Sequence, residues 1–544
     1  MDSDLPPDRP GGGFGYVFLV VFTAVVAARA GWLAGAEPAA VVDLFADDAY
    51  YYFGIARNVW QRGMVSFDGL EPTSGFHPLW LANLLPFFGL DLGRVGVLRA
   101  VGVYSLALYV VAVVAAGRYL YRSFGVLGAT ASLCFGIGVA DDVFAAGMET
   151  SLAIPLAVLS LLHVDRRCVA PYPSEGADGR FLLLGLLLSL LQLARLDAVL
   201  LGAITVGAVC LVHVGRAETT GHQTLGIGLR AAGPMAVSGA AYLAFNVWLT
   251  GCAVPISVRV KTMGDHLLNW KYLNLLVNHP AWTPVAMATV GGAVWCGWVI
   301  ASGRGGRGTV HPRDAAGLCS AAFMVVFSAS NLLSSTWSLW IWYQYPLVLF
   351  AFFAVPRIVE EASVGGLSGD VRSTGAAVLF VVTLVGVPVV QFASAPDRAG
   401  ASFKLLNRAA AEEMNRRLGP DSMQTVVAMG ERAGSFGYFF DGHVVHMEGL
   451  VGTTSTLRAI RRDRMAAFLD RRGVDMLVDY GYLDDEYGEA RITVPRPGLH
   501  LGPRAGLRVC RETEWYRWRL EGARVADATL RAWQWPSCTA EGSG

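Results

Sequence analysis

The sequence has 544 residues, of which 54% are hydrophobic and only 16% are charged. Soluble globular chains carry roughly a quarter charged residues, so this composition excludes an ordinary water-soluble protein and indicates one that lies largely in lipid. The 43 basic and 43 acidic residues give a net charge of zero. A balanced chain of this kind argues against a surface that binds nucleic acid or another polyanion.

The chain opens with a short polar stretch. Residues 1–13 lack the basic start and the small-residue cleavage site of a signal peptide. The apolar run at 14–33 is long enough to span about 30 Å of hydrocarbon. We therefore predict a cytoplasmic tail at 1–13 and a retained first transmembrane helix.

Ten further apolar runs follow the first one. They cover residues 97–117, 124–140, 150–162, 181–194, 198–212, 231–249, 284–300, 316–332, 339–355 and 375–392. The pattern predicts an all-α membrane domain at 14–392 with about eleven transmembrane helices.

Charges in the connecting segments predict the orientation. One alternate set is rich in arginine, and its members are Arg118, Arg122, Arg166, Arg167, Arg180, Arg216, Arg230, Arg304, Arg307, Arg313, Arg357 and Arg372. The other set holds Asp47, Asp48, Asp141, Asp142 and Glu149. Because cytoplasmic loops carry the excess of Lys and Arg, we expect a multi-pass plasma-membrane protein with a cytoplasmic N-terminus. An odd number of helices places everything after Phe392 outside.

The tail at 393–544 reads as a separate extracytoplasmic α/β domain. Residues 402–418 and 456–471 have helical patterns, and 425–429, 444–447 and 474–480 have strand patterns. Its two cysteines, Cys510 and Cys538, are predicted to form a disulfide because that compartment permits oxidation, and the alternative is two free thiols.

The first outer loop, at 35–78, contains the most informative stretch of the chain. It reads DDAYYYFGIARNVWQRG and then FDGLEPTSGFHPLW. From Asp47 the spacing predicts an amphipathic helix that lies in the membrane interface, with Tyr50, Tyr51, Tyr52 and Trp60 at headgroup level. Aspartates at a helix start are also good N-caps, and spacing alone leaves capping and catalysis equally open.

Elementary chemistry suggests what such carboxylates would do there. Nucleotide-activated sugars are cytoplasmic, so a sugar transferase that works outside needs a donor carried by lipid. A polyprenyl phosphate leaves as a stable anion, so the enzyme mainly needs a carboxylate to take the proton of the acceptor hydroxyl. It also needs a cation or a metal to offset the phosphate charge.

The Asp47–Asp48 pair running into AYYYFGIARN and PTSGFHPLW resembles the GT-C superfamily of polytopic glycosyltransferases, and more narrowly its arabinofuranosyl- and mannosyltransferase-like branch. Weaker matches are GMETSL, ARLDAVLL, VPISVRVK, WSLWIWYQYP and GYFFDGHVVHMEGLVG. The resemblance implies an inverting transfer from a polyprenyl-phosphate-linked sugar to a glycan, lipid or protein acceptor. It also implies a first-loop aspartate as base, which is Asp47 or Asp48, with Asp47 slightly favoured.

The glycosyltransferase hypothesis also suggests which residues bind the substrates. Arg259 and Lys261 are candidates for the donor phosphate, although they could equally contact anionic headgroups. Candidates for substrate binding are Tyr51, His77, Glu149, Trp337 and Tyr343. Arg195 and Asp197 are expected to pair with each other. The resemblance leaves metal dependence open, and a divalent cation such as Mg²⁺ or Mn²⁺ would take Asp47, Asp48 and Glu149 as ligands.

Two other classes of protein remain as alternatives. A secondary transporter would suit the helix count, but transporters place ionisable residues near the bilayer midplane and show repeated halves. In this sequence the charges cluster at the ends of the apolar runs, and no two halves match. A membrane acyltransferase would use His77 as base, but no nucleophile accompanies that histidine. The long outer loop and the large tail fit glycosyl transfer better.

Overall fold

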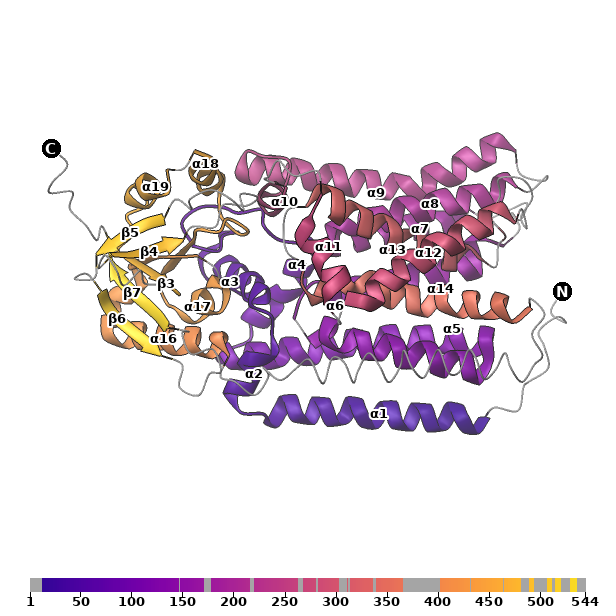
Figure 1. The fold of residues 1–544 in the computed structure, drawn as a ribbon, viewed down its shortest axis with the longest axis horizontal. Coiled ribbons are helices and arrows are strands. Elements are labelled where there is room, and N and C mark those ends of the chain that lie inside the picture. The colour runs from indigo at the N-terminus through magenta and orange to yellow at the C-terminus, as the bar shows by residue number, and fades with distance from the viewer. Residues whose placement is uncertain are drawn as a thin grey trace.

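A computed structural model describes residues 12–145, 147–170, 178–215, 220–262, 268–279, 282–302, 311, 314–335, 339–364, 402–430, 432–462, 464–480, 489–493, 506–510, 514–519 and 529–535. These residues form a long helical bundle with an α/β domain packed against one end of it (Figure 1).

Apolar helices make up the bundle. Its elements are α1 (Gly12–Gly35), α4 (Pro78–Phe88), α5 (Gly93–Ala145), α6 (Thr150–His163), α7 (Asp178–Ala194), α8 (Val199–Val214), α9 (Gly221–Thr250), α12 (Thr283–Ala301), α13 (Ala315–Ser334) and α14 (Tyr345–Val364). Short helices α10 (Ile256–Lys261) and α11 (Trp270–Asn278) lie near its domain-facing end, and short turns η1 (Val164–Cys168), η2 (Leu196–Ala198) and η5 (Ile341–Gln344) connect longer elements.

Among the described residues, five helical stretches are long and apolar enough to cross a membrane. They are Gly93–Ser123, Leu196–Val214, Thr283–Ala301, Ala315–Ser334 and Ile341–Ile358, and shorter apolar helices cover Phe22–Gly35, Pro78–Phe88 and Gly179–Ala194. A mostly helical integral membrane protein is thereby confirmed. The count of eleven spans stays a prediction, because the span at 375–392 lies outside the described residues.

One predicted loop is absent. The runs at 97–117 and 124–140 both fall within α5, so Arg118 and Arg122 are helical rather than in a connecting loop. The stretch between the runs, RYLYRS, contains neither proline nor glycine to end a helix.

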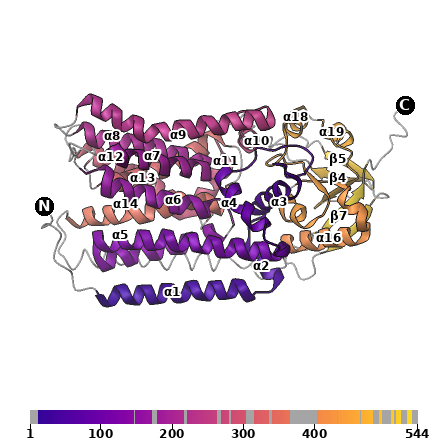
Figure 2. The same ribbon diagram turned by 180° about the vertical axis from the view of Figure 1, so that it is seen from behind.

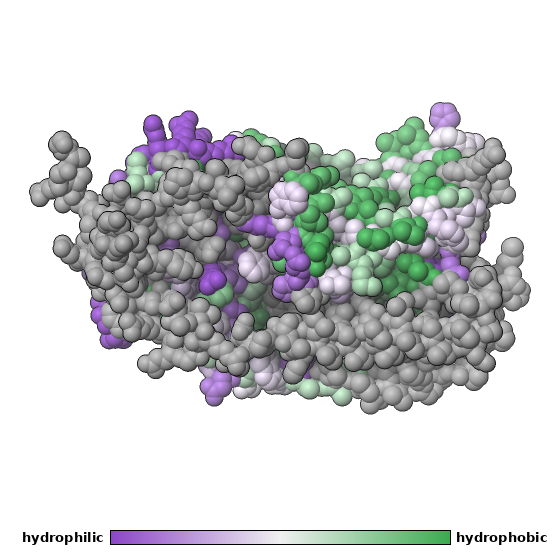
Figure 3. All heavy atoms as spheres, in the orientation of Figure 1, coloured by the Kyte–Doolittle hydropathy of each residue, from purple (hydrophilic) through white to green (hydrophobic). Residues whose placement is uncertain are grey.

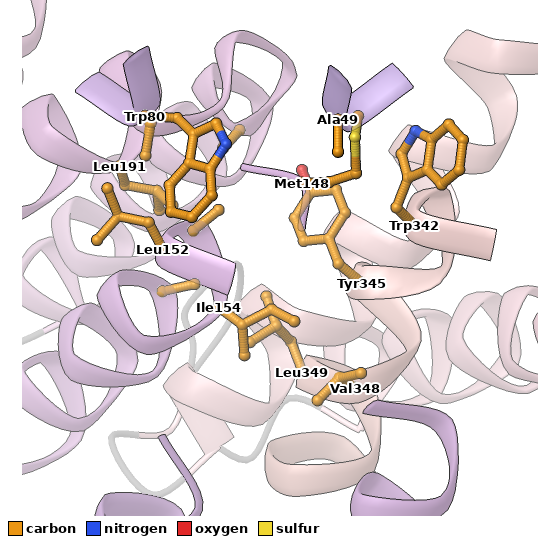
Figure 4. Close-up of a cluster of buried hydrophobic side chains, with 14 of the residues drawn as sticks. Ala49, Trp80, Met148, Leu152, Ile154, Leu191, Trp342, Tyr345, Val348 and Leu349 are labelled. Atoms are coloured by element: carbon orange, nitrogen blue, oxygen red, sulfur yellow. The ribbon is translucent and has the colours of Figure 1, made fainter. Parts of the chain in front are cut away.

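Side chains from several helices share one apolar core. Figure 4 shows Ala49 of the loop helix α3 (Asp47–Arg62), Trp80, Leu152, Leu191 and Leu349 converging on it, each of them buried or, for Leu152, nearly so. Trp80 is fully buried. This core supports the residues that follow Asp48 and Glu149 in sequence.

The C-terminal domain is built around a mixed sheet. Its helices are α16 (Phe403–Leu418), α17 (Ala433–Phe439), α18 (Thr454–Arg462) and α19 (Met465–Arg471), with a turn η7 (Gly419–Met423). Its strands are β1 (Val426–Met429), β2 (His443–His446), β3 (Met476–Asp479), β6 (Glu514–Arg519) and β7 (Thr529–Gln534), in the order β2-β1-β3-β7-β6. Strand β1 runs parallel to β2 and β3, and β7 is antiparallel to β3 and β6.

Strands β4 (Glu489–Thr493) and β5 (Gly506–Cys510) form a separate antiparallel pair. Cys510 ends β5, whereas Cys538 lies outside the described residues, so the disulfide stays a prediction.

The loop at 35–78 forms α2 (Pro38–Leu44) and α3, and α3 lies between the bundle and the C-terminal domain in both views (Figures 1 and 2). The prediction that α3 lies in the membrane interface is wrong. Tyr50, Tyr51 and Tyr52 are all buried, and only Trp60 is exposed, at 57%. The physical reason is that α17 and α4 cover the helix, which a local pattern cannot reveal.

Candidate active site

Asp47 binds the C-terminal domain. Its carboxylate accepts hydrogen bonds from the backbone N–H of Gly434 (3.0 Å) and Ser435 (2.9 Å), and from the Ser435 hydroxyl (2.6 Å). Burial raises the pKa of Asp47, although these hydrogen bonds and Lys404 act in the opposite direction. The alternative that Asp47 caps its own helix is wrong, because α3 has no side-chain cap and Asp47 instead caps the start of α17.

Arg57 binds the other end of α17. Its guanidinium donates to the carbonyls of Gly437 (3.2 Å), Tyr438 (2.8 Å) and Phe440 (3.1 Å). An anion at the start of a helix and a cation at its end both complement the helix dipole. Because one α3 helix supplies both charges, α3 and α17 run side by side in the same direction.

Asp48 is placed differently from its neighbour. Among the described residues, no group donates a hydrogen bond to its carboxylate, and the side chain is largely shielded from solvent. The pKa of Asp48 is raised to about 7: burial is the largest cause, the negative charges of Asp47, Glu448 and Glu149 act in the same direction, and Lys261 acts against them. A carboxylate with a pKa near 7 can both accept and release a proton at neutral pH.

Lys261, at the end of α10, supplies the positive charge that acts most strongly on Asp48. Its ammonium donates to the Tyr343 hydroxyl at 2.7 Å. Burial lowers the pKa of Lys261, but Tyr343, Asp48 and Glu149 outweigh burial, so the pKa is raised and the side chain stays a cation. The structure thus brings two predicted residues, Lys261 and Tyr343, to the same place as Asp48.

Glu149 belongs to a buried ionic network on the bundle side. Its carboxylate accepts from Arg195 (2.6 Å) and from the Tyr52 hydroxyl (3.0 Å). Arg195 also donates to Asp197, with the shortest bond at 2.9 Å, which confirms the predicted pairing. Because Arg195 is almost fully buried between two carboxylates, it fixes Glu149 rather than leaving it free.

The Arg195 guanidinium also connects the Glu149 network with the tyrosine that binds Lys261. It stacks over the rings of Tyr343 (4.9 Å) and Tyr345 (4.5 Å). The Tyr345 hydroxyl donates to Asp197 at 2.9 Å. Tyr343 therefore stands between Arg195 and Lys261, and its orientation is fixed from both sides.

His77 precedes α4 and also faces this network. Its Nδ1 accepts from the backbone N–H of Leu196 at 3.1 Å, so the proton of the neutral ring lies on Nε2. That atom is 3.5 Å from Glu149, and the ring stacks on Tyr52. Burial lowers the pKa of His77, with Glu149 acting against it, so the ring is neutral near pH 7.

Two residues of the site come from the C-terminal domain, and our sequence reading did not single them out. The Tyr51 hydroxyl lies 3.2 Å from Nε2 of His446, and that nitrogen lies 3.4 Å from Glu448. Glu448 in turn acts on Asp48. Polar residues directly after a buried strand, as in HVVHMEG, were the available signal.

Of the remaining predicted residues, Arg259 is not gathered here. Arg259 donates to the sulfur of Cys252 at 2.9 Å. Trp337 lies outside the described residues. Among the described residues no three His, Cys, Asp or Glu side chains could hold a metal ion. The predicted cation ligands do not fit, because Asp47 is bound to α17 and Glu149 to Arg195 and Tyr52.

Comparison with known proteins gives a likeness in structure alone. No protein family model and no curated protein matches the sequence. ArnT from Cupriavidus metallidurans bound to undecaprenyl phosphate aligns with a TM-score of 0.50 at 14% identity, over 87% of this chain and 93% of ArnT. The apo form of ArnT aligns with a TM-score of 0.50 at 13% identity, over 89% of this chain and 97% of ArnT.

The oligosaccharyltransferase of Archaeoglobus fulgidus aligns with a TM-score of 0.48 at 11% identity, over 84% of this chain and 68% of that enzyme. At these identities the likeness concerns the fold, and ArnT aligns over almost its whole length. The chain has the fold of ArnT.

Proposed function

We propose that this protein transfers a sugar from a polyprenyl-phosphate donor to a hydroxyl of a glycan, lipid or protein acceptor on the extracytoplasmic face of the membrane. The observation that carries the proposal is the contrast between two adjacent carboxylates. The carboxylate of Asp47 already accepts three hydrogen bonds from α17. Asp48 has a raised pKa, and among the described residues no group donates a hydrogen bond to it.

Asp48 acts as the general base. It removes the proton of the acceptor hydroxyl while that oxygen attacks the anomeric carbon of the donor sugar. The bond between this carbon and the phosphate oxygen breaks, and its electron pair leaves with the polyprenyl phosphate. Because the nucleophile attacks opposite the leaving group, the anomeric configuration inverts.

Lys261 binds the phosphate of the donor. A cation beside a leaving phosphate stabilises the charge that develops in the transition state. Lys261 keeps its charge because Tyr343 accepts its hydrogen bond and Asp48 lies nearby. Tyr343 contacts the donor through the same hydroxyl, and Arg259 does not take part because it points to Cys252.

Glu149, His77 and Tyr51 contribute to substrate positioning. Glu149 and His77 form one side of the site together with Tyr52, and their hydrogen bonds fix them in place. Tyr51 forms the opposite side with His446 of the C-terminal domain. Polar groups held in this way can bind the hydroxyls of a sugar without reorganising during the reaction.

The likeness to ArnT supports the choice of donor. That enzyme was crystallised with undecaprenyl phosphate, and its alignment covers 87% of this chain. A lipid-linked phosphate also fits a site at the end of a bundle with helices of membrane-spanning length.

Purified protein incubated with labelled polyprenyl-phosphate sugars and crude envelope glycolipids tests this function. We expect label to leave the lipid donor and polyprenyl phosphate to accumulate, and we expect nucleotide sugars to be inert. Transfer from nucleotide sugars but not from lipid donors would contradict the proposal, as would loss of a labelled acyl chain from a lipid.

A further inference from the structure

The arginine face, which we define as the exposed arginines of α18, α19 and the turn between them, stands out on the C-terminal domain. Residues 454–472 contain six arginines and two aspartates, a net charge of +4 in a chain that is neutral overall. Five of the six are exposed: Arg458, Arg461, Arg462, Arg464 and Arg471. Figure 3 shows hydrophilic side chains gathered at the upper left, where Figure 1 places these helices.

The face is rigid rather than a loose charged run. Ile460 of α18, and Phe468 and Leu469 of α19, are buried against the sheet, and Leu457 of α18 is buried against α10. The arginines consequently project from the opposite side of the helices. Arg472 is the exception, because it turns inward to Glu71 at 2.8 Å and Asp68 at 3.5 Å.

The start of α18 is tied to the end of a bundle helix. The Thr454 hydroxyl donates to the carbonyl of Thr250, the last residue of α9, at 3.0 Å. Leu450 and Leu457 form an apolar cluster with Ile256 and Val260 of α10. The arginine face therefore stands directly beside the bundle end and beside the helix that carries Lys261.

Aromatic side chains mark the lipid–water boundary at the same level. Trp248, two residues before Thr250, is 78% exposed and packs against Phe245 with ring centroids 5.8 Å apart. Trp270, at the start of α11, is 64% exposed. Exposed tryptophans of this kind settle at headgroup level. A nine-residue helix is about 13 Å long, so all the α18 arginines lie close to that level.

We propose that the arginine face binds the headgroups of anionic lipids in the leaflet at this end of the bundle. Arg458, Arg462, Arg464 and Arg471 have no side-chain ion pair among the described residues, so their charge is available to phosphate groups. Binding seats the C-terminal domain on the membrane. It also raises the concentration of lipid phosphates near α10. The inference depends on the fold and not on the reaction.

Photolabelling in nanodiscs tests the proposal without measuring transfer. Full-length protein is reconstituted in phosphatidylcholine with a small fraction of a headgroup-photoreactive lipid, either phosphatidylglycerol or phosphatidylcholine, and labelled peptides from residues 454–472 are quantified. One basic residue near an anionic surface contributes about 1 kcal/mol, or about fivefold in binding. Arg458→Gln with Arg462→Gln should thus lower labelling by the anionic analogue about 25-fold, and the double Lys variant should restore it.

The matched control is Arg416→Gln with Arg417→Gln, which also removes two arginines from the C-terminal domain. These residues pair with Glu413 and lie twelve or more residues, about 18 Å, beyond the bundle-proximal Lys404 of α16. We expect their labelling to match the wild type. Equal labelling by both headgroups, or an unchanged yield in the α18 double variant, would overturn the proposal. Loss of labelling with millimolar inorganic phosphate would also overturn it, by indicating a small-anion site.

Discussion

Two adjacent aspartates show that the surroundings of a residue decide its role. Asp47 and Asp48 have the same chemistry and the same helical turn, and the sequence slightly favoured Asp47 as base. The structure gives the carboxylate of Asp47 three hydrogen bonds to α17 and leaves Asp48 with Lys261 as its main opposing charge. The pair could be found from sequence, but the choice within it depends on α17, which lies nearly 390 residues away.

The pH dependence of transfer follows from the pKa of Asp48. The base must be ionised, so kcat/KM should rise with pH as one group titrates, with a midpoint of about 7. The Asp47→Asn variant removes a negative charge that raises the pKa of Asp48, so the midpoint of its profile should move to lower pH at whatever activity it retains. A flat profile between pH 5.5 and 8.5 would show that Asp48 does not act as base.

The charge of Lys261 should matter more for donor binding than for folding. Lys261→Gln removes a charge-assisted contact worth about 1.5–3 kcal/mol, so KM for the lipid donor should rise about 10- to 100-fold. Arg259→Gln, on the same short helix, is the matched control and should leave KM within a factor of two. An equal change in KM for the two substitutions would contradict the assignment of Lys261 as the residue that binds the donor phosphate.

At the scale of elements, the helix α3 is the joint between the bundle and the C-terminal domain. Its helical pattern was evident in the sequence, but its burial was not, because the covering helix comes from the far end of the chain. Gly434 shows how close the contact is, since an added Cβ would lie 2.2 Å from the carbonyl oxygen of Asp47. The strand and helix patterns of the tail were also readable, whereas the split between α18 and α19 was not.

Arg57 tests this joint. Arg57→Gln leaves up to three buried carbonyls at the end of α17 without their donor, so we expect a loss of about 2–4 kcal/mol of stability. Arg62→Gln is the control, because Arg62 is exposed and, among the described residues, hydrogen-bonds only to the ring of His443. Thermal unfolding in detergent would measure both. A midpoint for Arg57→Gln equal to that of Arg62→Gln would contradict the account of the joint.

For the whole molecule, composition predicted a membrane protein and the loop charges predicted its orientation. The structure adds that the loop at 35–78 and the C-terminal domain meet at one end of the bundle, as Thr73 bonded to the carbonyl of Gly452 at 2.7 Å illustrates. Which side of the membrane this end faces stays a prediction from the arginines. Chain-wide contacts of this kind have no local sequence signal.

Impermeant thiol labelling in whole cells checks the orientation. Cysteines placed at Gln61 and Ala409, both exposed at the domain end, should be labelled together, whereas a cysteine at Arg166 should react only after the membrane is permeabilised. Labelling at Arg166 without permeabilisation would reverse the orientation. Labelling at only one of the first two positions would contradict the placement of the first loop and the C-terminal domain at the same end of the bundle.

The central claim is that Asp48 is the base in a lipid-linked sugar transfer, and it is tested most directly by the transfer rate per folded enzyme in Asp48→Asn and Asp47→Asn. Asp48→Asn should fold well, because the raised pKa of Asp48 means that its ionised form destabilises the folded state as pH rises through about 7. Its turnover should nonetheless fall about 10²–10⁴-fold. Asp47→Asn should lose stability and keep most of its turnover per folded molecule. Near-normal turnover in Asp48→Asn would contradict the account.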